Sequence, residues 1–211
     1  MKALRGAVVG ALALLALASG AAWPTNVSAS AAADLCKPRT STGLMIGKVI
    51  EVVHGDVAIG GKYVGAAPFD IRSGVRICTD ANGQVIFTLT RPRGRIACNT
   101  LPGSRLVATP KTLQFVAGTS WCFGQGDAGS LSGGSTTVPF EVARDTLFGV
   151  LVRPNAVIVK VVSGSVSVSG SIIRKSRQAA LTSPRETDRV ALTAADRSAV
   201  AELSAALAQE R

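Results

Sequence analysis

The sequence predicts an all-β fold, an antiparallel two-sheet sandwich or β-roll, followed by a short C-terminal helix. Runs rich in Val, Ile and Thr alternate apolar residues with small or polar ones, which is the two-residue period of a half-buried strand. Asn-Gly, Pro-Gly and similar turn sequences separate these runs. Near the C-terminus the apolar residues instead recur at helical spacing. Many short strands joined by regular turns are typical of sandwiches and rolls.

Residues 1–31 predict a secretory signal peptide. Lys2 and Arg5 are followed by an apolar run over residues 6–22, and an Ala-Ser-Ala cleavage site ends the segment, with an earlier alternative site at residues 18–22. This order is typical of export signals. An uncleaved membrane anchor is the alternative, although the run is slightly shorter than the roughly 20 apolar residues of a spanning helix. We expect membrane contact only transiently, through this segment, and expect residues 32–45 to form an N-terminal segment of the exported chain.

The 211-residue chain is basic, with a formal net charge of +10. Most basic residues are scattered, and only residues 91–95 and 174–177 hold clusters of them. Aromatic residues are few and are not interleaved with these clusters, so the sequence shows no stacking surface for single-stranded nucleic acid. We therefore expect no nucleic-acid partner. The charge favours anionic cell-wall polymer as a partner, but a solvated surface is the simpler interpretation.

The β domain is predicted to span residues 46–173. Its strands are expected at 45–53, 56–60, 75–79, 84–90, 94–99, 104–108, 112–117, 138–143, 147–152, 156–162 and 165–173. Between these runs, the Gly/Ser-rich segment 124–135 is expected to be a mobile loop inside the domain.

Two segments of the β domain share one motif. Residues 52–59 and 161–168 both read V-V-x-G-x-V-x-[IV]. In each copy a glycine, Gly55 or Gly164, allows a bend or bulge that a side chain would resist. Two copies are too few for a solenoid. The motif therefore predicts two equivalent strand–kink–strand units at opposite ends of one domain.

The C-terminal segment, residues 174–211, is predicted to contain a helix near residues 193–209. Thr193 and Asp196 match the pattern of a capping box, and apolar residues follow at helical spacing. Such a helix can pack on the domain, fray as a tail or bind a partner. The sequence leaves these three roles open.

Four cysteines, Cys36, Cys78, Cys98 and Cys122, predict two disulfides. An even number of cysteines in an exported chain usually forms a disulfide framework. Four buried free thiols are the alternative. No Cys-x-x-Cys spacing occurs and the chain has one histidine, so we expect no metal site.

The sequence allows three pairings of these cysteines. If three strands between residues 75 and 99 form a meander, Cys78 and Cys98 lie at the same level one strand apart. This arrangement favours a Cys78–Cys98 bond, which leaves Cys36 for Cys122. Next-but-one strands are about 9–10 Å apart, whereas a disulfide needs Cα atoms within about 7 Å. The favoured pairing therefore requires strong curvature of the sheet or a different strand order.

Six short elements succeed one another along the β domain. They are VHGDV at 53–57, GVRICT at 74–79, LPGSRL at 101–106, FEV at 140–142, RDTLF at 144–148 and VVSGSVSV at 161–168. In this order they resemble the FecR-like domain, an all-β module of bacterial cell-envelope proteins. The resemblance covers about residues 46–173 and implies a β fold and a place in the cell envelope.

One departure from the family is Asp145, which stands where its members usually have glycine. The best-known settings of the FecR-like domain join it to a sigma-factor regulator with a cytoplasmic segment or to peptidoglycan-binding modules. The sequence predicts neither of these. The resemblance therefore implies the fold and the location more than a role in signalling.

The sequence shows no catalytic constellation, and we expect a non-catalytic protein without a cofactor. The single histidine, His54, lies beside a glycine bend and is expected at the surface, at a strand end. No Gly-x-Ser-x-Gly elbow and no phosphate-binding glycine loop occurs. Carboxylates distant in sequence can still meet in a glycosidase. A hydrolase would have to gather such acids in one cleft, for example Asp56, Asp70, Asp80 and Glu141.

The sequence therefore favours an exported, non-catalytic β domain that acts as a protein-binding or scaffolding module in the bacterial cell envelope. We expect it to be secreted, periplasmic or associated with the cell wall, with an envelope protein as its partner. A ligand can add a strand to an exposed sheet edge or bind near the Gly-rich segment 124–135. The alternative is a salt-sensitive binder of anionic envelope polymer, and a secreted hydrolase is less favoured. The sequence identifies no ligand-binding residues.

Overall fold

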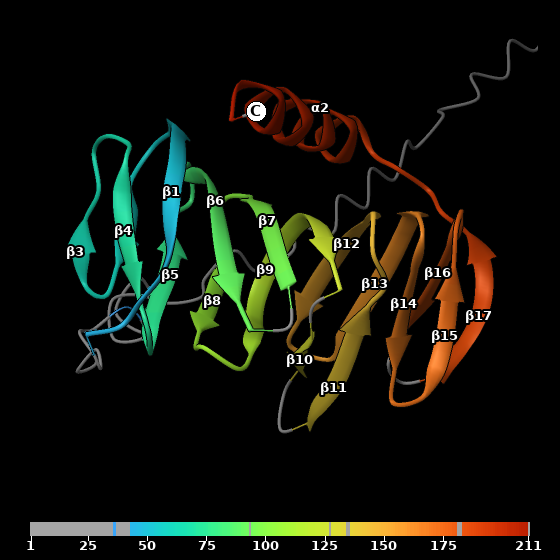
Figure 1. The fold of residues 1–211 in the computed structure, drawn as a ribbon. Coiled ribbons are helices and arrows are strands. Elements are labelled where there is room, and N and C mark those ends of the chain that lie inside the picture. The colour runs from blue at the N-terminus through green and yellow to red at the C-terminus, as the bar shows by residue number, and fades with distance from the viewer. Residues whose placement is uncertain are drawn as a thin grey trace, which may run out of the picture.

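The structure, a computed structural model, describes residue 36 and residues 43–92, 94–126, 128–133, 136–180 and 183–210. It confirms the predicted fold class, because the described chain is mostly β-strand with one short helix near its C-terminal end (Figure 1). The predicted signal peptide, residues 1–31, lies outside the described residues.

The strands form two hydrogen-bonded sheets, which we call sheet A and sheet B. The order in sheet A is β4-β1-β6-β7-β9-β12-β13-β16-β17. The order in sheet B is β3-β2-β5-β8-β9-β10-β11-β14-β15. All of these pairs are antiparallel except β9–β10, which is parallel. The elements are β1 (Met45–His54), β2 (Val57–Ile59), β3 (Lys62–Tyr63), β4 (Phe69–Arg72), β5 (Val75–Thr79), β6 (Gln84–Arg91), β7 (Gly94–Thr100), β8 (Arg105–Ala108), β9 (Leu113–Gln125), β10 (Ala128–Gly133), β11 (Thr136–Val142), β12 (Thr146–Arg153), β13 (Ala156–Ser163), β14 (Ser165–Val168), β15 (Ser171–Arg174), β16 (Arg177–Ala180), β17 (Ser183–Arg189) and α2 (Ala194–Gln209).

Strand β9 belongs to both sheets because it crosses between them at Gly118. Its first residues pair with β8 in sheet B, and the residues from Gly118 onward pair with β12 and β7 in sheet A. Gly118 has a φ of +82°, and a Cβ there would lie 2.3 Å from the hydroxyl oxygen of Ser104. The crossing therefore requires glycine at this position.

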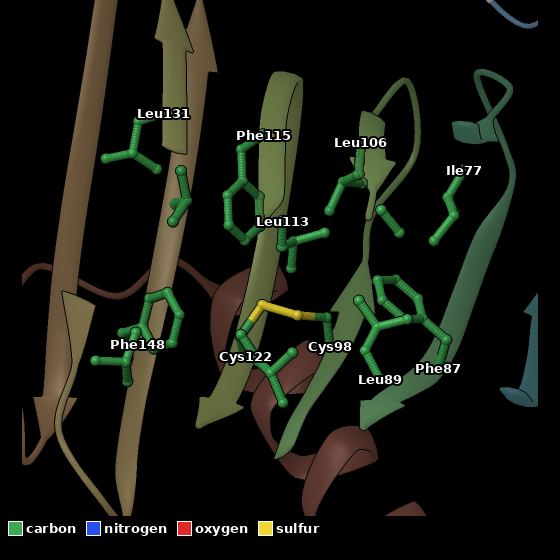
Figure 2. Close-up of a cluster of buried hydrophobic side chains, with 14 of the residues drawn as sticks. Ile77, Phe87, Leu89, Cys98, Leu106, Leu113, Phe115, Cys122, Leu131 and Phe148 are labelled. Carbon is green, nitrogen blue, oxygen red and sulfur yellow. A yellow bond between two sulfur atoms is a disulfide. The ribbon is translucent and has the colours of Figure 1, made fainter. Parts of the chain in front are cut away.

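The hydrophobic core lies between the two sheets. It is built from inward-facing side chains, such as Phe87 and Phe148 from sheet A and Phe115 and Phe140 from sheet B. The ring centroids of Phe115 and Phe140 lie 5.7 Å apart, and those of Phe140 and Phe148 lie 6.0 Å apart. Figure 2 shows part of this core. Because Phe140 and Phe148 come from opposite sheets, their contact holds the sandwich together near its centre.

The repeated motif forms two equivalent units, as predicted. β1 passes through Gly55 into β2, and β13 passes through Gly164 into β14, so each copy moves from sheet A to sheet B. The two glycines have φ values of +66° and +75°. A Cβ on Gly55 would lie 2.3 Å from the backbone oxygen of Asn82, and one on Gly164 would lie 2.1 Å from the hydroxyl oxygen of Thr146. Each kink therefore needs glycine both for its backbone conformation and for space.

The prediction of a loop over residues 124–135 is wrong. β9 continues into this segment, and residues 128–133 form β10, which pairs with β9 and β11. Leu131 is fully buried and anchors β10 in the core. A Cβ on Gly129 would lie 2.4 Å from the backbone oxygen of Leu113. The small residues therefore allow close approach of neighbouring strands instead of marking a loop.

Sheet A also continues beyond residue 173, where the β domain was predicted to end. β16 pairs with β13, and β17 pairs with β16.

The predicted strand 165–173 is a hairpin formed by β14 and β15. Its turn residues, Ser169 and Gly170, have φ values of +49° and +81°. The positive φ values reverse the chain in the middle of an apolar run that looked continuous.

All four cysteines form disulfides, but the expected pairing is wrong. The bonds are Cys36–Cys78 and Cys98–Cys122 rather than Cys78–Cys98 and Cys36–Cys122. The meander assumption fails because β5 lies in sheet B, whereas β6 and β7 form a hairpin in sheet A. Cys98 and Cys122 are direct cross-strand partners, with Cα atoms 4.1 Å apart (Figure 2). Both are fully buried, whereas Cys36 is partly exposed.

Helix α2 packs on the outer face of sheet A and lies along one side of the sandwich (Figure 1). Its predicted capping box is present: the Thr193 hydroxyl accepts from the Asp196 N–H, and the Asp196 carboxylate accepts from the Thr193 N–H. Leu203 and Ala206 are buried against a cluster that includes Ile86 of β6. Of the three roles that the sequence left open, the structure shows packing on the domain.

Candidate functional site

The structure does not bring the acids considered for a hydrolase into one group. Asp56 and Asp80 meet at a turn, where the Asp80 N–H donates to the Asp56 carbonyl oxygen at 3.1 Å. Asp70 lies on β4 at the edge of sheet A, and Glu141 lies on β11 in sheet B. His54 ends β1 and is exposed, as predicted.

A hollow of about 230 Å³ lies beside the first turn of α2. Its lining includes Trp121 of β9, Gly149 of β12, Lys160 of β13 and Asp196 of α2. Trp121 is fully buried. A Cβ on Gly149 would lie 2.8 Å from Cη2 of the Trp121 ring, so glycine makes room for the indole. The ring therefore lies directly against the β12 backbone.

Asp196 joins α2 to the wall of this hollow. Its Oδ1 accepts from the Trp121 indole N–H at 2.9 Å, and its Oδ2 lies 2.9 Å from the Lys160 Nζ. Lys160 also donates to the carbonyl oxygen of Ala191 at 2.9 Å. The Lys160 and Asp196 side chains are only 14% and 8% exposed. Burial opposes ionisation of Asp196, but the Thr193 N–H, Lys160 and Trp121 together hold its pKa below the usual value.

Two further acids extend this attachment along α2. The Glu202 carboxylate accepts from the side-chain amides of Gln84 at 2.5 Å and Asn99 at 3.0 Å. Glu210 forms ion pairs with Lys48 and Arg95 on sheet A. Polar contacts therefore secure α2 at both ends and in the middle, around the small apolar cluster beneath it.

We interpret the hollow as part of the contact that attaches α2 to sheet A, which we call the α2 joint, rather than as a ligand site. It is smaller than the roughly 300–1,000 Å³ of typical small-molecule pockets. Its central charges, on Lys160 and Asp196, neutralise each other. Sequence reasoning missed this joint because Trp121, Lys160 and Asp196 are far apart in the chain. The capping-box pattern was the one signal, and it indicated a helix start rather than a buried ion pair.

The two ends of the sandwich differ in what they expose. At one end, β3 and β4 are edge strands of sheets B and A. The large apolar side chains exposed there are Tyr63 at 79%, Met45 at 61% and Leu44 at 58%. At the other end, Ile172 on β15 is 50% exposed, and the edge strand β17 has the sequence SPRETDR. Among the described residues, three large apolar side chains are exposed at the β3–β4 end and one at the other end, so the β3–β4 end is the better candidate for an interaction site.

No family model, no curated protein and no solved structure matches this chain. The likeness to the FecR-like domain therefore stays a prediction from sequence motifs. Within the described ranges, no group of three or more His, Cys, Asp or Glu side chains is placed to hold a metal ion. None of the helices in the described part of the chain is long and apolar enough to span a bilayer.

Proposed function

We propose that this chain is an exported β domain that binds another protein, as a scaffolding module of the bacterial cell envelope. The observation that carries the proposal is the difference between the two ends of the sandwich. The β3–β4 end combines two short edge strands with the exposed side chains of Tyr63, Met45 and Leu44. Exposed apolar side chains beside a sheet edge are typical of protein-binding surfaces.

The two disulfides support a location outside the reducing cytosol. Cys98–Cys122 crosslinks two strands of the core, and Cys36–Cys78 ties residue 36 to β5. Disulfides persist in oxidising compartments, and the predicted signal peptide agrees with export. A secreted, periplasmic or wall-associated location fits both observations.

The backbone also supports the FecR-like prediction. Asp145 stands where that family usually has glycine, and its φ of +55° lies in the left-handed region. Aspartate tolerates this region better than most residues. Gly74, the first residue of the matching element GVRICT, has a φ of +83°. At both positions the backbone therefore restricts the choice of residue.

The proposal is tested by a crosslinking pull-down of residues 32–211 against the chain's own envelope fraction, at low and high salt. We expect one or a few proteins to be recovered at both salt concentrations. Tyr63→Lys should reduce recovery several-fold, because a charge replaces the exposed ring. Ile172→Lys is the matched control, because Ile172 follows Gly164 at the same spacing as Tyr63 follows Gly55, and it should leave recovery unchanged. Both side chains are at least half exposed, so neither change should unfold the domain.

The same experiment distinguishes the alternative function. Recovery of wall polymer alone, lost at high salt, would indicate a salt-sensitive binder of anionic envelope polymer, because salt screens charge-driven binding. Equal loss of recovery in the Tyr63→Lys and Ile172→Lys variants would contradict the assignment of binding to the β3–β4 end.

A further inference from the structure

The two units that share the repeated motif correspond beyond the motif itself. After each kink the chain makes a tight turn with positive φ at both turn residues, Gly60 and Gly61 in one unit and Ser169 and Gly170 in the other. Each turn leads into a short edge strand of sheet B, β3 or β15. The spacing from the motif glycine to the turn is the same in both units.

The correspondence extends to the side chains of β3 and β15. Tyr63 and Ile172 occupy matching positions and are 79% and 50% exposed. The residues directly after them, Val64 and Ile173, are 4% and 1% exposed. In each unit the chain then returns to sheet A, where β4 pairs with β1 and β16 pairs with β13. The pairing of β4 lies a few residues nearer the start of β1 than the pairing of β16 lies to the start of β13.

The units differ on the outer side of these returning strands. β16 carries another antiparallel strand, β17, on the side away from β13. Among the pairings of the described residues, β4 has β1 as its one neighbour. Within the part of the chain that the structure describes, the place beside β4 that corresponds to β17 is therefore an open sheet edge, where backbone N–H and C=O groups face outward.

The side chains of β4 define what kind of strand fits this edge. Ile71 is fully buried in the core, and Phe69 packs against it, whereas Asp70 and Arg72 are exposed. Arg72 donates to the Gly43 carbonyl oxygen at 2.9 Å. A strand added beside β4 therefore places apolar residues next to Phe69 and Ile71 and polar residues next to Asp70, where a basic side chain is favoured.

We propose that β4 accepts an extended, alternately apolar and polar segment of a partner protein as an antiparallel strand, in the position that β17 fills on β16. This inference rests on the proposed protein-binding function and names the mode of binding. Main-chain hydrogen bonds supply affinity in this mode, and alternate side chains supply specificity.

The test uses residues 32–211 and a displayed library of random ten-residue peptides as the probe. We expect the selected peptides to alternate apolar and polar residues and to perturb the backbone amide resonances of Phe69–Arg72. N-methylation of the peptide amides that face β4 should weaken binding about tenfold, because it removes the main-chain donors. N-methylation of the intervening amides is the matched control and should have a smaller effect. Asp70→Lys should weaken the binding of those peptides that place a basic residue next to position 70.

Several results would overturn the inference. Strand addition at β4 would be excluded if no peptide were selected or if the selected peptides perturbed amides elsewhere. Equal effects of the two N-methylation patterns would also exclude it. Slow hydrogen exchange in the free chain at the β4 amides that face away from β1 would mean that the edge is already filled by the chain itself or by a second copy. The pull-down is independent of this test. A recovered partner with crosslinks far from β4 would leave the proposed function standing and remove only the strand-addition mode.

Discussion

Asp196→Ala should detach the first turn of α2 from sheet A. The substitution removes three contacts of the carboxylate, with the Trp121 indole N–H, the Lys160 ammonium and the Thr193 backbone N–H, each at 2.9 Å. It also leaves Lys160, which is 14% exposed, without its counter-ion. Loss of capping costs about 1 kcal/mol, and breaking a buried ion pair costs about 3–5 kcal/mol. Since this pair is slightly exposed, we expect a total loss of about 3 kcal/mol in the free energy of unfolding.

Urea denaturation monitored by tryptophan fluorescence measures this loss. The chain has two tryptophans, and Trp23 lies within the predicted signal peptide, so Trp121 is the sole reporter in residues 32–211. Trp121 is fully buried and bonded to Asp196, so its emission should shift to longer wavelength as α2 detaches. With a urea m-value of about 2 kcal/mol/M, the midpoint should fall by about 1.5 M.

A control and a double-mutant cycle make this prediction specific. Ser204→Ala changes an exposed position on the same helix and should alter the unfolding free energy by less than about 0.5 kcal/mol. Lys160→Ala combined with Asp196→Ala should cost less than the sum of the two single changes, because each removes the same ion pair. An Asp196→Ala midpoint within about 0.2 M of the unmodified chain would refute the reasoning.

Three further perturbations probe the disulfides, the packing around Trp121 and the charge of Asp196. A mild reductant should open the disulfide of the partly exposed Cys36 before that of the fully buried Cys98, as shown by thiol alkylation and mass spectrometry. Gly149→Ala should lower the free energy of unfolding, measured by urea denaturation, by about 1–3 kcal/mol and shift the Trp121 emission, because the added Cβ meets the ring at 2.8 Å. The lowered pKa of Asp196 means that its stabilisation is complete above about pH 5 and is lost as the pH falls through the folded-state pKa. Asp196→Ala should therefore lose less unfolding free energy than the unmodified chain on acidification, as measured in urea at several pH values.

Local patterns in the sequence predicted most strands and the helix, because alternation and capping depend on neighbouring residues. The runs at 75–79 and 84–90 coincide with β5 and β6, with ends within a residue. Which strands pair could not be predicted, because a strand shows the same alternation whether its neighbour in sequence lies beside it or in the opposite sheet. The incorrect pairing of Cys78 with Cys98 resulted directly from that ambiguity.

The loop prediction for residues 128–133 was wrong for a different physical reason. Its glycines and serines are typical of loops, and only Leu131 indicates burial. The strand forms because neighbouring backbones pack where Gly129 has no Cβ, and this depends on tertiary contacts rather than on local preference. The candidate site was hidden for a similar reason. β3 and β4 are short, and their position at the edge becomes visible only when the order of both sheets is known.

The repeated motif shows how geometry alone can impose a sequence pattern. A strand that leaves sheet A for sheet B must kink where another part of the backbone or a side chain lies close, and Gly55 and Gly164 meet that requirement against Asn82 and Thr146. Alternating valines on both sides then fill the same core from the two sheets. The repeated V-V-x-G-x-V-x-[IV] motif is therefore weak evidence of a relationship to the FecR-like domain, since any strand crossing of this kind favours it. The left-handed Asp145, with a φ of +55°, also lies where the chain crosses between the sheets, from β11 in sheet B to β12 in sheet A, so its conformation follows from the same geometric requirement.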